Sequence, residues 1–257
     1  MLKLAITGKG GVGKTTLAAL LAYLFAERGH KVLAIDADPA TGLAVACGVP
    51  PEQAAQITPV AEMEDLIYER TGARKGEVGG FFKLNPRVDD IPDRFAVTVD
   101  GIRILTMGTV KTGGTGCLCP ENALLRSLVT HLLLRRDEVL IMDMEAGVEH
   151  LGRGTASAVD ALIVVVEPGY RSLQTAHTIR ALARDLGIER IYAVGNKVTS
   201  EADRAFISSQ LSGFHLLGFL SSDPQALEAD RRGQAVFALA PQLLVEARAI
   251  VDRLAAR

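Results

Sequence analysis

Short apolar runs alternate with longer helical patterns along most of the chain. The apolar runs predict strands at residues 2–7, 31–36, 138–143, 161–167, 190–195 and 215–220. Between and after them, apolar residues at helical spacing predict helices at residues 15–28, 120–134, 171–187, 200–212 and 241–256. This alternation indicates an α/β fold, with a mainly parallel, twisted sheet that helices cover on both faces.

Two stretches depart from this alternation. Residues 95–105 flank Asp100-Gly101, a pair that favours a tight hairpin turn, so we expect an antiparallel edge there. Residues 72–94 contain several glycines and prolines and show no clear period, which predicts an irregular surface insert. We expect the rest of residues 1–257 to form one domain around a single sheet.

Composition narrows the class of protein. The chain has 257 residues, 48% of them hydrophobic, with 28 Lys and Arg against 30 Asp and Glu. Such a balance creates no global field that favours nucleic acid or an anionic membrane. No stretch approaches the roughly 20 apolar residues of a bilayer span, and the chain enters a core strand at once instead of a signal peptide. We expect a cytoplasmic protein whose cysteines stay reduced and which binds neither nucleic acid nor membranes.

A phosphate-binding loop follows the first predicted strand. Residues 8–15 read Gly-Lys-Gly-Gly-Val-Gly-Lys-Thr and lead into a helix, as in a Walker A sequence. In such a loop the backbone N–H groups cradle phosphate, the later lysine neutralises the β- and γ-phosphates and the following hydroxyl binds Mg²⁺. The predicted nucleotide-binding residues here are Gly10, Gly11, Val12, Gly13, Lys14, Thr15 and Thr16. Lys9 is an additional cation that this task does not require.

Carboxylates end two further predicted strands, where ligands of parallel sheets bind. Asp36 and Asp38 end the second strand and Asp143 ends the strand over residues 138–143. Asp143 is typical of a Walker B residue at Mg²⁺, with Thr15 and Asp36 completing the predicted magnesium set. Asp38 is placed to orient or deprotonate the attacking water. We therefore predict ATP and Mg²⁺ as ligands and Lys14 and Asp38 as catalytic residues, to which the family resemblance of the loop adds Lys9.

The segment from Lys9 to Thr15 resembles the deviant Walker A loop of the nitrogenase iron protein and MinD class, and the resemblance covers nearly the whole chain. It implies that Lys9 reaches the phosphates bound by a second subunit, so that the ATP-bound form is a face-to-face homodimer. A surplus cation there offsets the repulsion between two triphosphates. Asn196 and Lys197 resemble the segment that reads the purine in these ATPases; the alternative is a strand-end Asn in a turn.

Residues 113–116 form a glycine-rich stretch, and the next four residues are Cys117-Leu118-Cys119-Pro120. A tetrahedral site for a soft metal uses about four nitrogen or sulfur ligands, and one chain offers two. A two-fold dimer would supply Cys117 and Cys119 twice, on its axis. The proline suits a helix start, where thiolates are favoured. Ligand chemistry alone does not separate Ni²⁺ from Zn²⁺, and two small, partly buried residues remain an alternative.

Taken with residues 143–150, this cysteine segment is similar to the CooC family, which matures carbon monoxide dehydrogenase by nickel insertion. The resemblance implies an ATP-hydrolysing metallochaperone that acts on the apoenzyme of carbon monoxide dehydrogenase or a related nickel enzyme. Two positions depart from relatives. Met144 stands where relatives often carry Thr, and residues 40–42 lack a polar or acidic residue found in some of them.

Two other functions remain open at this point. An iron-sulfur electron donor of the nitrogenase iron protein type would take cluster ligands from well-separated segments, whereas both thiols here share one CxC. A MinD or ParA-like positioning ATPase would carry a basic face or a terminal amphipathic anchor, and the sequence offers neither.

Overall fold

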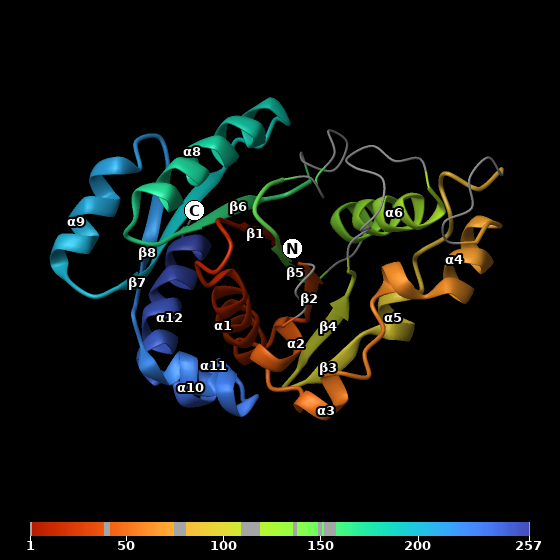
Figure 1. Cartoon of the computed structure of the whole chain (residues 1–257), viewed down its shortest axis with the longest axis horizontal. Coiled ribbons are helices and arrows are strands. Elements are labelled where there is room, and N and C mark those ends of the chain that lie inside the picture. Colours follow the sequence, from red (N-terminus) through yellow and green to blue (C-terminus); the bar gives the residue numbers. More distant parts are fainter. Residues whose placement is uncertain are drawn as a thin grey trace.

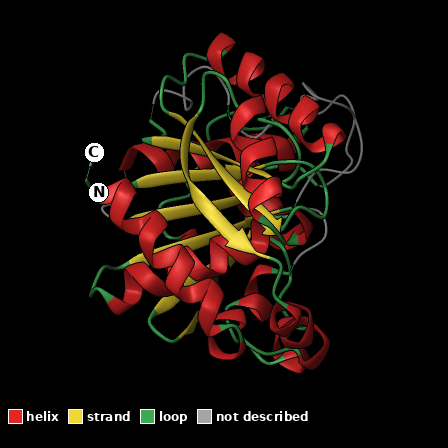
Figure 2. Ribbon diagram, turned by 90° about the vertical axis from the view of Figure 1, so that its left-hand side faces the viewer, coloured by secondary structure: helices red, strands yellow, loops and turns green. Residues whose placement is uncertain are grey.

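The computed structural model describes residues 2–38, 42–74, 81–108, 119–135, 138–148, 151 and 158–256. Its strands form one sheet, drawn in yellow in Figure 2. The order of the strands is β3-β4-β2-β5-β1-β6-β7-β8. All neighbours pair in parallel except β3 and β4. The strands are β1 (Lys3–Thr7), β2 (Val32–Ala37), β3 (Val97–Val99), β4 (Ile102–Thr106), β5 (Val139–Met144), β6 (Ala161–Val166), β7 (Ile191–Val198) and β8 (His215–Ser221). The predicted parallel α/β sheet is confirmed.

Helices connect these strands and lie on both sides of the sheet (Figures 1 and 2). The longer ones agree with the predicted helices to within a few residues. They are α1 (Lys14–Glu27), α6 (Pro120–Arg135), α8 (Tyr170–Asp185), α9 (Glu201–Gln210) and α12 (Pro241–Ala255). The sequence pattern did not predict the shorter ones, which are α2 (Leu43–Ala46), α3 (Pro51–Ala54), η1 (Val60–Glu62), α4 (Glu64–Thr71), α5 (Ile91–Phe95), α10 (Pro224–Arg232) and α11 (Val236–Leu239). Most of them are too short to show a helical period.

The sheet separates two apolar cores because successive strand residues point to opposite faces. In β2, for example, Leu33 and Ile35 belong to one core while Val32 and Ala34 belong to the other. The first core lies between the sheet and helices α4, α6, α8 and α9. The second lies between the other face of the sheet and helices α1, α2, α11 and α12. Strands β1, β2, β5 and β6 are buried along their whole length. This double cover explains why these strands are largely apolar, and β6 entirely so.

The predicted antiparallel edge is present as the β3–β4 hairpin. Asp100 and Gly101 both have positive φ, 46° and 77°, as a two-residue hairpin turn requires. Val97 pairs with Ile104 and Val99 with Ile102. Strand β4 then joins β2 in parallel, so β3 closes this edge of the sheet.

The predicted insert at residues 72–94 is described from residue 81 onward and in residues 72–74. Val88 and Ile91 are buried and belong to the core under α4 and α6. Ile91 also begins α5, which leads directly into β3. Residues 88–94 are therefore anchored locally, because three apolar residues in this polar stretch, Val88, Ile91 and Pro92, are buried.

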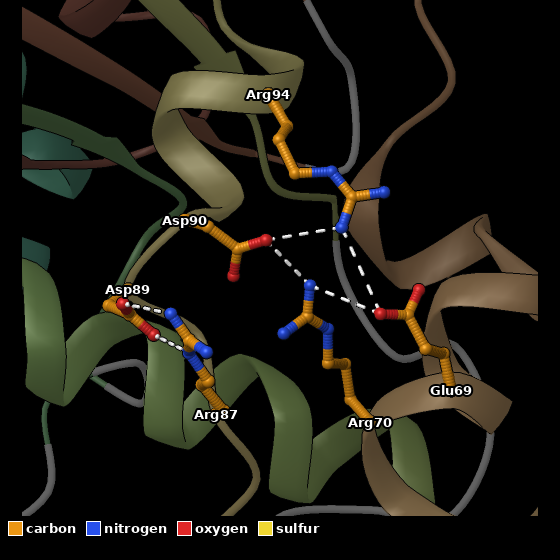
Figure 3. A network of polar contacts seen from close by, with 6 residues as sticks. All are labelled: Glu69, Arg70, Arg87, Asp89, Asp90 and Arg94. Atoms are coloured by element: carbon orange, nitrogen blue, oxygen red, sulfur yellow. Dashed lines mark hydrogen bonds and ion pairs between the residues drawn. The ribbon is translucent and has the colours of Figure 1, made fainter.

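An ion-pair network, hereafter the α4–α5 network, joins α4 to α5 (Figure 3). The side chain of Arg70 is only 9% exposed and donates to the Asp90 carboxylate at 2.7 Å. Arg94 donates to the same carboxylate at 3.1 Å, and Glu69 lies near both guanidinium groups. Burial raises the pKa of Asp90, but the two arginine hydrogen bonds outweigh it and hold that pKa below its ordinary value. The network fixes the segment that precedes the hairpin.

No helix among the described residues is both long enough and apolar enough to span a bilayer.

Candidate nucleotide and metal site

The candidate site lies where five neighbouring strands end. In the order β2-β5-β1-β6-β7, their carboxyl ends carry Asp36, Asp143, the phosphate-binding loop, Glu167 and Asn196. Asp36 and Asp143 stand in register on adjacent strands. The parallel topology thus brings together residues that are far apart in the sequence, at the edge where ligands of such sheets bind.

Backbone conformation explains the glycines of the loop that joins β1 to α1. Gly8, Gly11 and Gly13 have φ of 149°, 78° and 95°, which other residues rarely adopt. A Cβ on Gly13 would lie 2.1 Å from the Asn196 amide nitrogen, whereas one on Gly10 or Gly11 would meet nothing within 4 Å. The loop is therefore packed on its inner side and open on its outer side, above the N-terminus of α1. Helix starts leave backbone N–H groups without intrahelical acceptors, and these suit a phosphate.

Lys14, the first residue of α1, is buried at this helix start. Its ammonium lies 3.6 Å from the Asp38 carboxylate. Two of the three predicted catalytic side chains, Lys14 and Asp38, therefore meet directly beside the loop. In this arrangement Asp38 neutralises the cation that a β/γ-phosphate would otherwise bind.

A buried carboxylate pair lies beside Thr15. Asp143 accepts a 2.6 Å hydrogen bond from the Thr15 hydroxyl through one oxygen, while its other oxygen is buried without a hydrogen-bond partner among the described residues. Burial, together with the neighbouring Asp36 and Asp38 charges, raises the pKa of Asp143 to about 7 against the hydrogen bond from Thr15. Burial likewise raises the pKa of Asp36 to about 6, although its carboxylate accepts from the N–H groups of Gly42 and Leu43.

These groups fit a magnesium ion. A hard dication favours oxygen ligands, and an unpaired buried carboxylate oxygen beside a threonine hydroxyl supplies them. A bound cation would also remove the like-charge repulsion between Asp36 and Asp143. The hydrogen bonds from Gly42 and Leu43 instead point Asp36 toward the start of α2, so its support of the ion is indirect in this conformation.

Asn196 and Lys197 pack against the phosphate-binding loop. The Asn196 amide donates to the Val12 carbonyl at 2.7 Å and accepts from the Lys197 N–H at 2.8 Å. Lys197 has a φ of 56°, unusual for a residue with a side chain, and its ammonium donates to the Gly11 carbonyl at 2.6 Å. Both polar ends of Asn196 therefore bind the chain itself, and its contact with adenine stays a prediction.

Glu167 is a member of the site that sequence reasoning missed. It follows β6, and its carboxylate lies 3.2 Å from the Lys9 ammonium and 3.5 Å from the Lys197 ammonium. Lys9 therefore pairs within its own chain here. A glutamate directly after the apolar run of β6 is the same strand-end signal that drew attention to Asp36 and Asp143.

Thr7 is a second residue that the sequence did not single out. Its buried hydroxyl donates at 2.9 Å and 2.8 Å toward the carbonyls of Glu145 and Gly147 and accepts from the Gly147 N–H. The end of β1 is thereby tied to the segment after Asp143. A threonine in an apolar strand gives no sequence signal for such a contact.

Of the two cysteines in the predicted metal site, the structure describes only Cys119. Cys117 lies outside the described residues, as do residues 149–150 of the segment that supported the family resemblance and residues 40–41, where the sequence departs from relatives. Cys119 is buried next to the start of α6, where its carbonyl accepts from the Ala123 N–H. It lines a cavity of about 590 Å³ between α6 and residues 82–88. Within the described part of the chain, no group of three or more His, Cys, Asp or Glu side chains is arranged to hold a metal.

Comparison with known proteins identifies the family. Residues 3–236 match the family described as the CobQ/CobB/MinD/ParA nucleotide binding domain. The carbon monoxide dehydrogenase accessory protein CooC of Rhodospirillum rubrum is 48% identical over 256 residues, which cover 100% of this chain and 97% of that protein. The chain belongs to the CooC family. An uncharacterised ATP-binding protein of Methanocaldococcus jannaschii is 44% identical, over 91% of each chain.

Solved structures agree with this fold. The MinC:MinD cell division protein complex of Aquifex aeolicus gives a TM-score of 0.69 at 19% identity, over 100% of this chain and 96% of that one. MinD complexed with Mg-ADP from Pyrococcus horikoshii gives 0.62 at 18%, over 99% and 98%. These structures show a shared fold, and the family match makes the chain a nucleotide-binding P-loop ATPase of the MinD and ParA class.

Proposed function

We propose that the chain is an ATP-driven metallochaperone, which forms a homodimer on binding ATP and inserts nickel into carbon monoxide dehydrogenase during maturation. The observation that carries the proposal is the full-length similarity to CooC, joined to a P-loop with an additional lysine and to a CxC before α6. The role of CooC as a carbon monoxide dehydrogenase accessory protein supports the client, and the two thiols support a metal as cargo.

The nucleotide half of the cycle follows from the contacts at the loop. When the nucleotide binds, Lys14 exchanges its contact with Asp38 for contacts with the β- and γ-phosphates, because these carry more negative charge than one carboxylate. Asp38 is then available to orient the attacking water and accept its proton. Thr15 and Asp143 would hold Mg²⁺, which supplies charge stabilisation at the phosphoryl oxygens.

The metal half of the cycle requires two subunits. Each contributes Cys117 and Cys119, and Lys9 contacts the triphosphate of the other subunit, so ATP draws the two thiolate pairs together. Hydrolysis removes the γ-phosphate contacts and shifts the population toward a looser metal site. The nickel ion, or zinc in its place, is released as the thiolates separate.

Transfer of nickel to the apoenzyme tests this proposal. Nickel-loaded protein and Mg-ATP should activate a carbon monoxide dehydrogenase apoenzyme, and Cys117→Ala or Cys119→Ala should abolish both stoichiometric metal binding and activation. Cys47→Ala is the matched control because Cys47 is buried in the core at the end of α2. Full activation by the Cys117→Ala and Cys119→Ala variants would contradict the proposed metal site.

The role of Lys9 has its own test. Lys9→Ala should weaken ATP-dependent dimer formation and hydrolysis more than it weakens ATP binding, because its phosphate contact is made across the dimer. Titration of a fluorescent ATP analogue and a steady-state ATPase assay separate the two effects. Hydrolysis by Lys9→Ala at the wild-type rate would count against the contact across the dimer.

A further inference from the structure

We propose that Glu167 is a positioning residue that holds Lys9 within its own subunit until the triphosphate of a second copy competes for it. This inference rests on the proposed contact of Lys9 across the dimer. It adds a residue outside the Walker sequences and a reason for the dimer to form with ATP and not with ADP.

Geometry places Glu167 between two cations. Its carboxylate oxygens lie 3.2 Å from the Lys9 ammonium and 3.5 Å from the Lys197 ammonium, one oxygen for each. The backbone N–H of Glu167 donates to the Ser172 hydroxyl at 3.1 Å, which fixes the residue at the end of β6 beside the N-terminus of α8. The carboxylate is therefore held by the fold, while Lys9 is the long, movable partner.

The Lys9 pair is suited to being exchanged. The Lys9 side chain is 39% exposed and that of Glu167 is 26% exposed, so both face water and the pair is weak. A γ-phosphate offers more negative charge and more acceptor oxygens than one carboxylate. ATP of a second subunit can therefore displace Glu167 from Lys9, whereas ADP lacks the phosphate that makes the exchange favourable.

Lys197 lowers the free-energy cost of moving Lys9 from Glu167 to the phosphate. When Lys9 leaves, Glu167 retains the Lys197 ammonium, so its charge is not left unpaired. Lys197 is itself held by the Gly11 carbonyl at 2.6 Å and adopts a left-handed φ of 56°. An unfavoured backbone conformation at a loop contact is expected where the position of a side chain matters.

Sedimentation of Glu167→Gln tests the proposal directly. The neutral amide keeps the shape of the side chain but releases Lys9, so dimers should form at lower protein concentration with a non-hydrolysable ATP analogue and Mg²⁺. An exposed pair corresponds to roughly a two- to five-fold bias for each subunit, and a dimer releases two, so the dimer dissociation constant should fall by about 4- to 25-fold. Glu228→Gln is the matched control, since Glu228 pairs with Arg232 on α10.

Two further measurements separate positioning from a structural role. Lysine acylation followed by mass spectrometry should label Lys9 faster in nucleotide-free Glu167→Gln than in wild type. In the Lys9→Ala background, Glu167→Gln should no longer change the dimer dissociation constant, because the group it restrains is absent.

The outcomes distinguish this inference from the proposed function. If wild type stays monomeric with the ATP analogue, the proposed dimer fails. If wild type dimerises but Glu167→Gln dimerises equally well or less well, the dimer stands and the positioning role of Glu167 is overturned. The same conclusion follows if the effect of Glu167→Gln persists without Lys9.

Discussion

Two groups of charged side chains in this molecule have opposite electrostatics. At the carboxyl ends of β2 and β5, burial raises the pKa of Asp36 to about 6 and that of Asp143 to about 7. In the α4–α5 network, two arginines hold the pKa of Asp90 below its ordinary value (Figure 3).

The difference shows where this fold keeps unsatisfied charge. A buried carboxylate that lacks a counterion destabilises the folded protein unless a ligand supplies the charge, so its presence indicates a binding site. Carboxylates already paired with arginine need no ligand and act to position helices. Substitutions should therefore affect catalysis at the first group and stability at the second.

The largest effect is expected from Asp143→Asn. It should lower the ATPase rate by about 100-fold or more, because a charged metal ligand is lost, while leaving the nucleotide-free protein as stable as wild type or more stable. Steady-state hydrolysis and chemical denaturation measure the two. Asp89→Asn, a matched change next to the α4–α5 network, should leave hydrolysis unchanged. If Asp143→Asn lost stability but kept the wild-type ATPase rate, Asp143 would be a stabilising residue and not a metal ligand.

Arg70→Met should produce the converse result. Removal of the nearly buried guanidinium leaves Asp90 with Arg94 alone, so the free energy of unfolding should fall by about 2 kcal/mol. ATPase activity per folded molecule should be retained. Arg87→Met is the control, since Arg87 and Asp89 form an exposed pair. Equal denaturation midpoints for Arg70→Met and Arg87→Met would contradict a stabilising role of the network.

The pH dependence of stability should also differ between the two groups. Asp143 has a folded pKa of about 7 against an ordinary 3.8, so its contribution to stability is present below about pH 3.8 and is lost as the pH rises through 7. Denaturation of the nucleotide-free protein should reveal a loss of at most about 1.4 kcal/mol per pH unit in this range, relative to Asp143→Asn. Asp90 has the opposite sign, because its contribution is lost as the pH falls. Parallel pH profiles for wild type and Asp143→Asn would rule out the raised pKa.

The smallest effect is expected from Asn196→Ala. Loss of the hydrogen bond to the Val12 carbonyl should loosen the loop and weaken nucleotide binding by about three- to ten-fold. Asn85→Ala provides the control, because Asn85 is exposed and lines the cavity between α6 and residues 82–88. A change in preference between ATP and GTP, instead of a uniform loss, would favour the predicted adenine contact over loop support.

Much of this arrangement can be predicted from local sequence. The strands β1, β2, β5 and β6 are covered on both faces, so their sequences are largely apolar, and Gly8, Gly11 and Gly13 occur where positive φ is required. Asp36, Asp38 and Asp143 are recognisable because each acid follows such a run. The turn at Asp100-Gly101 is equally local in origin.

Other features depend on contacts between distant segments. The pairing of Lys9 with Glu167 joins residues 158 positions apart, and Asn196 meets Val12 across 184. Residues 88–94 are anchored by three buried apolar residues, Val88, Ile91 and Pro92, whose spacing shows no helical or strand period. Local patterns specify the strands and the loop, whereas tertiary packing decides which side chains meet.

The most direct test of the account is sedimentation combined with metal analysis, at saturating nickel and saturating Mg²⁺ with an ATP analogue. The account predicts a dimer that holds one nickel ion for two chains, and monomers with ADP at the same protein concentration. A monomer under fully saturating conditions, or one nickel ion bound to each single chain, would contradict it.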